Sequence, residues 1–176
     1  MADILATVPW TTEREVARVD HLFHAHAPRG GRISARSLVQ LKELEANPFN
    51  RQLCNVFSAE DDGSLDVIEF VDLFTCMSKA APLSTKLTVA FRMLDQDGDG
   101  FIGRGDVESV VSLLITKADD KPDDDLELLE RDEAARVVDR VLKEGDVDGN
   151  ELISPTEFVK LMSHVTDFAS KFSISL

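Results

Sequence analysis

The stretch DQDGDGFIGRGD, residues 95–106, decides the fold of this chain. Carboxylates stand at its positions 1, 3 and 5, a glycine stands at position 6, and Asp106 closes it at position 12. Oxygen ligands at this spacing suit a hard divalent cation, and the glycine permits the sharp turn that brings them together. The predicted ligands are Asp95, Asp97, Asp99, the backbone carbonyl of Phe101, and Asp106.

Three other stretches repeat this helix–loop–helix plan, which is that of an EF-hand. Position 8 of such a loop takes a β-branched or aliphatic residue, and aligning on it gives Ile33, Leu65, Ile102 and Ile153. The loops then span residues 26–37, 58–69, 95–106 and 146–157. Helical periodicity fills the segments between them, and an internal repeat is a stronger signal than one motif. We therefore predict an all-α fold of four EF-hands in two lobes, with short antiparallel pairing between the loops of each lobe.

Breaks in the pattern give the expected boundaries. Residues 1–10 form a flexible N-terminus, residues 11–80 the first pair of hands, and residues 81–165 the second pair, with Pro82 in the linker. Residues 166–176 carry Phe168, Phe172, Ile174 and Leu176 and are too apolar to extend into water. We expect this tail to form a helix that docks on an apolar groove of the second lobe.

The fourth loop, DVDGNELISPTE, carries its glycine at position 4 and Glu151 at position 6. Moving the frame to put Gly149 at position 6 would place Pro155 at position 12 and Glu151 at the buried position 8, so that register fails. In the register as written, Ser154 caps the exiting helix, Pro155 is its first residue and Glu157 completes a capping box. The predicted ligands are Asp146, Asp148, Asn150, the backbone carbonyl of Leu152, and Glu157.

The two loops should differ in ion preference. Glu151 must adopt a left-handed conformation, which costs about 1 kcal/mol for a residue other than glycine, while even a micromolar site supplies about 8 kcal/mol. The fourth loop is therefore expected to bind, more weakly than with a glycine there, and to prefer Ca²⁺ because Glu157 can reach an ion with both oxygens. Asp106 is one methylene shorter and favours six-fold geometry, so the third loop should take Mg²⁺ or Ca²⁺.

The first two loops are degenerate. The second begins with Ser58 but keeps Gly63 and Glu69, so occupancy is conceivable only at high calcium concentration. The first has no carboxylate at any ligand position and carries arginines instead, so its expected role is to pair with the second loop.

Composition excludes several classes of function. Acidic residues number 33 against 19 basic ones, for a net charge of −14, which argues against nucleic-acid binding and suits cations or basic peptide segments. Cys54 and Cys76 lie in apolar runs and are expected to be unpaired core thiols. No apolar run approaches a membrane span, the start lacks a signal-peptide layout, and Ala2 stands where myristoylation needs glycine. We expect a cytoplasmic protein without a direct lipid anchor, and no nucleophile–base pair or phosphate-binding loop indicates an enzyme.

Opened pairs of EF-hands expose an apolar groove that binds an amphipathic helix. The predicted lining is Phe91, Leu94, Leu114, Ile115, Val141, Leu142, Phe158 and Met162, with Met93 and Leu161 as further candidates. Each is also an ordinary core position, so core packing stays an alternative for all of them.

Three stretches together resemble the calcium- and integrin-binding (CIB) family. They are LKELEANPFNRQLCNVFS (residues 41–58), the loop 95–106 with its terminal aspartate, and the ending TDFASKFSISL (residues 166–176). The resemblance covers about residues 11–176 and implies two inactive N-terminal hands and two metal-binding C-terminal ones. It also implies capture of a helical segment from a membrane protein's cytoplasmic tail, and a C-terminal segment that can occupy or leave the groove. The ligands that carry over are Asp95, Asp97, Asp99, Asp106, Asp146, Asp148 and Glu157.

Three features depart from the family pattern: Ala2 in place of the myristoylated glycine of some relatives, Glu151 in place of the turn glycine, and the inserted tract ADDKPDDD. We expect a non-enzymatic Ca²⁺/Mg²⁺ sensor or adaptor. The alternatives are a regulatory subunit of an enzyme, similar to calcineurin B, which shares the four-hand plan, and a plain ion buffer that exposes no apolar surface on binding calcium.

Overall fold

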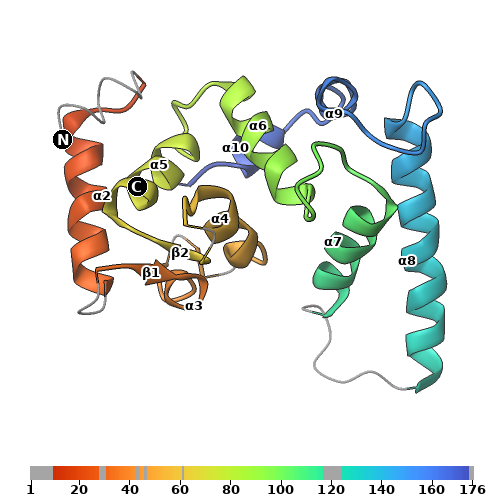
Figure 1. Cartoon of the computed structure of the whole chain (residues 1–176), viewed down its shortest axis with the longest axis horizontal. Coiled ribbons are helices and arrows are strands. Elements are labelled where there is room, and N and C mark those ends of the chain that lie inside the picture. Colours follow the sequence, from red (N-terminus) through yellow and green to blue (C-terminus); the bar gives the residue numbers. More distant parts are fainter. Residues whose placement is uncertain are drawn as a thin grey trace. The chain divides into compact units, whose positions relative to one another are not determined.

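The computed structural model describes residues 10–27, 31–42, 44–45, 47–60, 62–116 and 124–174 (Figure 1). The chain divides into two compact units. Unit 1 comprises residues up to Val89 together with those from Asp167 onward, and unit 2 runs from Ala90 to Thr166. The division therefore falls within helix α6 (Leu83–Leu94), and each unit is considered by itself.

Unit 1 contains two helix–loop–helix hands. Its elements are α2 (Glu13–His26), β1 (Ile33–Ser34), α3 (Ala35–Leu38), α4 (Asn50–Phe57), β2 (Ser64–Leu65), α5 (Val67–Cys76), the first part of α6, and α10 (Phe168–Lys171). Thr12 caps α2 in a reciprocal pair with Glu15, and Asp66 caps α5 in the same way with Glu69. Each cap satisfies backbone N–H groups that the first helical turn leaves without partners.

The two loops of unit 1 pair through their position-8 residues. Ile33 lies opposite Leu65 in the antiparallel β1–β2 pair, and both side chains are fully buried. Three aromatic rings form the centre of the core: Phe70 lies 5.4 Å from Phe23 and 4.7 Å from Phe74, between ring centroids. The predicted pairing of the loops is therefore present in this unit.

The C-terminal segment packs within unit 1. The Ile174 amide donates to the carbonyl of Met77 at 2.8 Å, and the Ile174 side chain is buried. The ammonium of Lys86 donates to the Ala169 carbonyl at 3.1 Å and to the Ser173 hydroxyl at 2.6 Å. Leu176 lies outside the described residues, and docking of this tail on the groove of the C-terminal hands stays a prediction.

Unit 2 contains the second pair of hands. After the end of α6 come α7 (Arg104–Thr116), α8 (Asp124–Gly145) and α9 (Pro155–Met162). Ile102 and Ile153 form an antiparallel bridge between the loops. The predicted capping box at the start of α9 is confirmed, because Ser154 and Glu157 form reciprocal hydrogen bonds with each other. Pro155 lies in the first turn of the helix. Both units therefore confirm the predicted all-α EF-hand fold. Most of the ADDKPDDD tract lies outside the described residues.

No helix in the described part of the chain is long and apolar enough to cross a membrane.

Candidate metal centres

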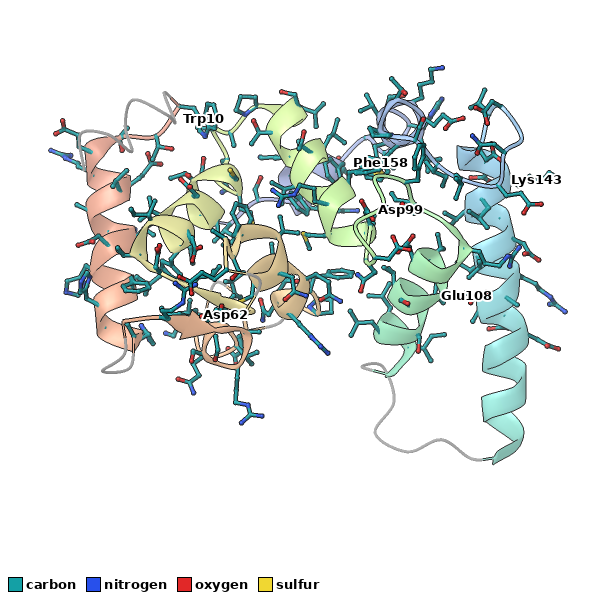
Figure 2. The ribbon with its side chains drawn as sticks, in the orientation of Figure 1. Trp10, Asp62, Asp99, Glu108, Lys143 and Phe158 are labelled. Atoms are coloured by element: carbon teal, nitrogen blue, oxygen red, sulfur yellow. The ribbon has the colours of Figure 1, made fainter. Side chains whose placement is uncertain are left out.

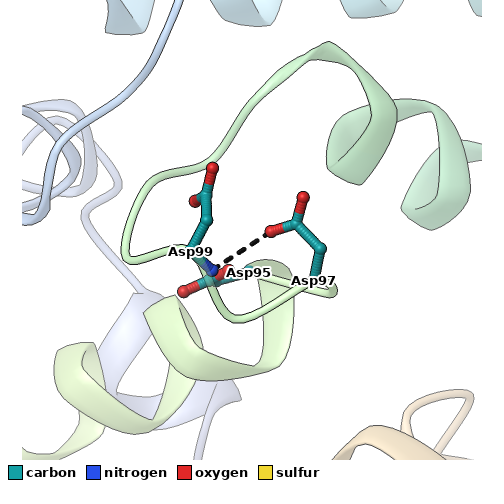
Figure 3. A group of neighbouring side chains, drawn as sticks. All are labelled: Asp95, Asp97 and Asp99. Atoms are coloured by element: carbon teal, nitrogen blue, oxygen red, sulfur yellow. Dashed lines mark hydrogen bonds between the residues drawn. The ribbon is translucent and has the colours of Figure 1, made fainter.

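The third loop holds its first three acidic side chains around one centre (Figure 3). One carboxylate oxygen from each of Asp95, Asp97 and Asp99 lies within 4.8 Å of the others. Asp95 anchors the turn, accepting from the Gly98 amide at 2.8 Å and the Gly100 amide at 3.1 Å. Desolvation is the main cause that raises the pKa of Asp95, and the nearby acidic groups add to it. A cation at this centre would offset that cost because it favours the ionised carboxylate.

The fourth loop has the same construction around Asp146. Its carboxylate accepts from the Gly149 amide at 2.7 Å and from the Glu151 amide at 2.8 Å. Asp148 and Asn150 each accept a backbone N–H from two residues further along the loop. Carboxylate oxygens of Asp146, Asp148 and Glu157 lie within 4.8 Å of one another. The frame chosen from the sequence is therefore the frame in which these groups converge.

Glu151 has the backbone conformation that the sequence predicts for it. Its φ of 66° makes it the one residue other than glycine with positive φ in the described part of the chain. Gly100, the equivalent residue of the third loop, has φ of 88°. Glu151 therefore carries strain that Gly100 avoids.

Position 4 of the third and fourth loops also has the left-handed backbone conformation that favours glycine, which was not predicted from the sequence. Gly98 and Gly149 occupy that position in the third and fourth loops, with φ of 73° and 78°. Gly149 is therefore not a displaced turn glycine but the equivalent of Gly98. Comparing the two loops at position 4 was the signal that could have shown it.

A second overlooked glycine, Gly145, ends α8 just before the fourth loop. A Cβ added there would lie 2.5 Å from Cδ1 of Ile153, so a larger residue would force the position-8 side chain to shift. This close approach sets the distance between α8 and the bridge that joins the loops.

The carboxylate at position 12 closes each of the last three loops with both oxygens. One oxygen accepts from the backbone N–H of position 2 and the other from that of position 9. The pairs are Ala59 and Asp66 on Glu69, Gln96 and Gly103 on Asp106, and Val147 and Ser154 on Glu157, at 2.7–2.9 Å. These backbone amides hold the position-12 carboxylate of each loop in place, which preorganises the loop for a cation.

The third and fourth loops differ in whether the position-12 carboxylate belongs to the converging acidic group of the loop. Asp106 and Glu157 are both buried, at 6% and 7% exposed. The acidic group of the fourth loop includes Glu157, while that of the third comprises Asp95, Asp97 and Asp99. Hydrogen bonds from Ser154 and Val147 lower the pKa of Glu157 to about 2, so its carboxylate is ionised at neutral pH. The shorter side chain of Asp106 makes the same two backbone bonds, from Gln96 and Gly103.

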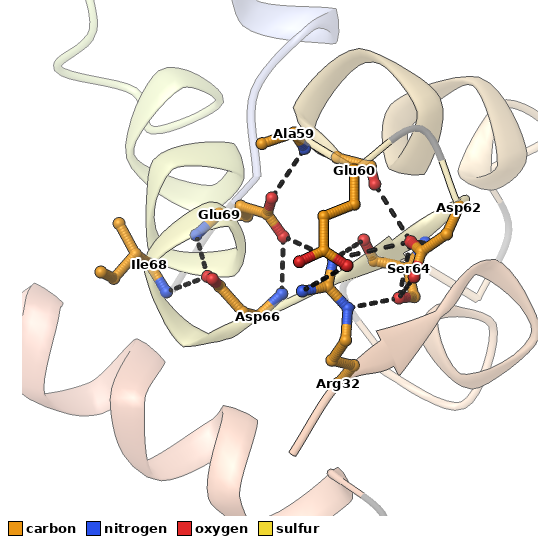
Figure 4. Close-up of polar contacts among 9 residues, drawn as sticks. Arg32, Ala59, Glu60, Asp62, Ser64, Asp66, Ile68 and Glu69 are labelled. Carbon is orange, nitrogen blue, oxygen red and sulfur yellow. Dashed lines mark hydrogen bonds and ion pairs between the residues drawn. The ribbon is translucent and has the colours of Figure 1, made fainter. Parts of the chain in front are cut away.

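The second loop already contains a positive charge, and the first loop supplies it. Arg32 directly precedes β1, and its guanidinium reaches the backbone carbonyl of Ser64 and the carboxylate of Glu69 in the second loop (Figure 4). The sequence predicts only a pairing role for the first loop, so this contact adds to that role. Arginine in a loop that pairs with an acidic one was the available signal.

The predicted groove residues divide by burial. Phe91, Leu142 and Phe158 are buried, and the rings of Phe91 and Phe158 meet edge to face with centroids 5.5 Å apart. Figure 2 shows Phe158 on α9 and Asp99 on the loop before α7. Leu114 is 47% exposed. The half-buried members are Leu94, Ile115, Val141 and Met162, with Leu161. Three of the eight predicted residues are therefore core, and the other five leave apolar surface accessible in unit 2.

Comparison with known proteins agrees with this geometry. The protein family described as an EF-hand domain pair matches this chain over residues 84–163. Calcium and integrin-binding family member 2 of Drosophila melanogaster is 32% identical over 94% of this chain and 88% of its own length. The chain belongs to the calcium and integrin-binding family. The mouse (Mus musculus) member 2 is 32% identical over 79% of this chain and 69% of its own length. The calcineurin B protein of Naegleria gruberi is 29% identical over 94% of this chain and 88% of its own length.

Membership in this family confirms the resemblance drawn from the three stretches of sequence, and it makes the chain an EF-hand protein of a calcium-binding family. The acidic groups of the third and fourth loops are its candidate metal centres.

Proposed function

We propose that this chain is a non-enzymatic Ca²⁺/Mg²⁺ sensor or adaptor of the cytoplasm, whose third and fourth loops hold the ions. The observation that carries the proposal is the pair of converging acidic groups joined by the Ile102–Ile153 bridge. Carboxylate and carbonyl oxygens are the ligands that Ca²⁺ and Mg²⁺ prefer in proteins. The proposed ligands of the third loop are Asp95, Asp97, Asp99, the Phe101 carbonyl and Asp106. Those of the fourth loop are Asp146, Asp148, Asn150, the Leu152 carbonyl and Glu157.

Ion preference differs between the two loops in this proposal. Glu157 belongs to its acidic group and can give Ca²⁺ two oxygens, so the fourth loop prefers Ca²⁺. Asp106 offers a shorter reach, which suits the smaller six-coordinate Mg²⁺. Under cellular Mg²⁺, the third loop would be occupied at rest and the fourth would respond to calcium.

The accessible apolar residues of unit 2 form the proposed partner surface. Leu114 on α7 is exposed, and Val141 on α8 and Met162 on α9 are half-buried. Apolar side chains on neighbouring helices suit the apolar face of an amphipathic helix. One relative's name includes integrin binding, which supports a membrane protein's cytoplasmic tail as the source of that helix. The net charge of −14 favours a basic segment.

Calorimetric titration of Ca²⁺ into metal-free protein, with and without millimolar Mg²⁺, tests the ion assignment. Two sites are expected, one of them competed by Mg²⁺. D106E should raise the Ca²⁺ affinity of the Mg²⁺-sensitive site, and the matched change E157D should lower that of the other site. A single site, abolished by D95N and untouched by E157D, would contradict a functional fourth loop.

An apolar fluorescent probe distinguishes a sensor from a plain buffer. Calcium should increase probe binding to unit 2, and L114D should reduce the increase while leaving the calorimetric sites intact. An unchanged probe signal on calcium binding would favour the buffer.

The second candidate function is a regulatory subunit of an enzyme, favoured by the similarity to calcineurin B over nearly the whole chain. Isolating the tagged protein from its own cells with calcium present tests this candidate. Stoichiometric recovery of a phosphatase catalytic chain would support it, while recovery of a membrane protein would support the adaptor.

A further inference from the structure

Arg32 of the first loop places its guanidinium among the polar groups of the second loop. Its Nε donates to the Ser64 hydroxyl at 2.6 Å, and its Nη2 donates to the Ser64 carbonyl at 2.9 Å and to Glu69 at 3.2 Å. The same guanidinium lies 3.5 Å from Asp62 and 3.8 Å from Glu60 (Figure 4). One side chain of the first loop therefore reaches four residues of the second.

These four residues stand at the metal-ligand positions of an EF-hand loop. Counting from Ser58, Glu60 is position 3, Asp62 is position 5, the Ser64 carbonyl is position 7 and Glu69 is position 12. The guanidinium thus lies among the same oxygen atoms that would surround a divalent ion. Position 1 is a serine, whose hydroxyl donates to Asp62 at 3.2 Å and adds no negative charge.

We propose that the guanidinium of Arg32 is the resident cation of the second hand, so that the N-terminal pair is closed without a divalent ion and excludes one from this loop. The proposal concerns unit 1 and does not depend on the ion sites of unit 2.

The fold holds Arg32 in place. It directly precedes Ile33, whose backbone is paired with Leu65 of the second loop. The pairing therefore keeps the guanidinium beside the site at a high effective concentration, against which a free ion must compete. The Arg32 side chain is 26% exposed and that of Glu69 is 12% exposed, so their contact is largely shielded from water. Hydrogen bonds between charged groups are stronger than neutral ones, and arginine remains charged at any physiological pH.

The charge balance of the loop agrees with this role. Hydrogen bonds from Ser64 are the largest cause that lowers the pKa of Asp62, and Arg32 also contributes. Asp62 is therefore ionised at neutral pH, and its negative charge faces the guanidinium at 3.5 Å. Glu69 accepts from the Ala59 amide at 2.7 Å, so the loop has the same closure as the two candidate metal loops.

The test is a Ca²⁺ titration of the ¹⁵N-labelled full chain, observed at the amides of Gly63 and Ser64. R32M removes the guanidinium and keeps an apolar stem. R18M is the matched control, because it removes the same charge from an exposed position on α2. Wild type and R18M should show no response in the second loop at millimolar Ca²⁺, while R32M should show a saturable one that E69Q abolishes. In chelator, R32M should melt about 4 °C or more below R18M.

Two results would overturn the proposal. One is an equal response of Gly63 in wild type and R32M, which would mean that calcium displaces the guanidinium. The other is an R32M protein that neither binds calcium in the second loop nor melts below R18M. If R32M does not fold, the melting temperature of R32K provides the test, because a single ammonium cannot contact all four oxygen groups at once. R32K should fold but melt below wild type, and a wild-type melting temperature would contradict the proposal. The amide of Gly100 reports the third loop separately, so failure of the proposed function is distinguishable.

Discussion

Ile102 and Ile153 exchange both of their backbone hydrogen bonds. The Ile102 amide donates to the Ile153 carbonyl at 3.0 Å, and the Ile153 amide donates back at 2.9 Å. Both side chains are buried, at 3% and 1% exposed. Each residue lies at position 8 of its loop, one residue beyond the carbonyl predicted to bind the ion. Ordering one loop therefore acts directly on the backbone of the other.

This bridge predicts that the two ion sites are coupled. D95N should remove the third site and also weaken Ca²⁺ binding in the fourth loop by about fivefold or more, the lower end of usual coupling energies. The measurement is a Ca²⁺ titration observed at the Gly149 amide. D132N, which makes the same charge change at an exposed position on α8, should leave the affinity unchanged. Equal Gly149 titrations in D95N and D132N would show that the bridge transmits nothing.

The left-handed backbone of Glu151 predicts a stabilising substitution. E151G should raise the free energy of unfolding of the metal-free protein by about 0.5–1 kcal/mol, because relief of strain exceeds the entropy cost of glycine. E151Q removes the charge but keeps the strain, so it should change stability little. Urea unfolding in chelator provides the comparison, and a gain in E151Q equal to that in E151G would attribute the effect to charge instead.

Lys86 is predicted to hold the C-terminal segment against unit 1. Its side chain is 2% exposed, and its ammonium donates to Ala169 and Ser173. K86M keeps the apolar stem but removes the ammonium and both of its hydrogen bonds. Amide exchange in residues 168–174 should accelerate by about tenfold or more, because the loss of one charged hydrogen bond already gives that factor. K79M, at an exposed lysine of the same unit, serves as the control. Unchanged exchange in K86M would mean that the Ile174–Met77 contact alone suffices.

The buried thiol of Cys54 predicts a pH-dependent term in stability. Burial raises its pKa from 9.0 to about 12, with Asp62 adding to the shift. Between these values the unfolded chain loses the thiol proton and the folded chain keeps it, so stability falls as pH rises. The stabilising contribution is complete below pH 9 and gone above about 12. C54A should therefore show a shallower loss of stability between about pH 9 and 11 in urea unfolding.

Alkylation with iodoacetamide checks the same thiol directly. At pH 9, native protein should leave Cys54 unmodified, because its side chain is fully buried and protonated, while protein in urea should react. The half-buried Cys76 serves as an internal control in the same chain. Rapid modification of Cys54 in native protein would contradict the burial.

The sequence alone determined the local features of the ion loops. Alternating oxygen donors and an aliphatic position 8 fix the register, because the ligands of a twelve-residue loop must converge on one point. The same register predicted the left-handed conformation of Glu151 and the capping box that Ser154 forms with Glu157. These features depend on residues within a few positions of one another, so their geometry follows from backbone rules.

Tertiary structure alone decided which distant residues share a site. The place of Arg32 among the ligands of the second loop depends on the β1–β2 pairing, which brings together residues 32 positions apart. The contacts of Lys86 with Ala169 and Ser173 and the close approach of Gly145 to Ile153 likewise depend on packing. Sequence periodicity shows which face of a helix is apolar, but it does not show what that face meets. That pairing is set by the free energy of the whole packed unit, in which each contact must outweigh the conformational entropy lost in forming it.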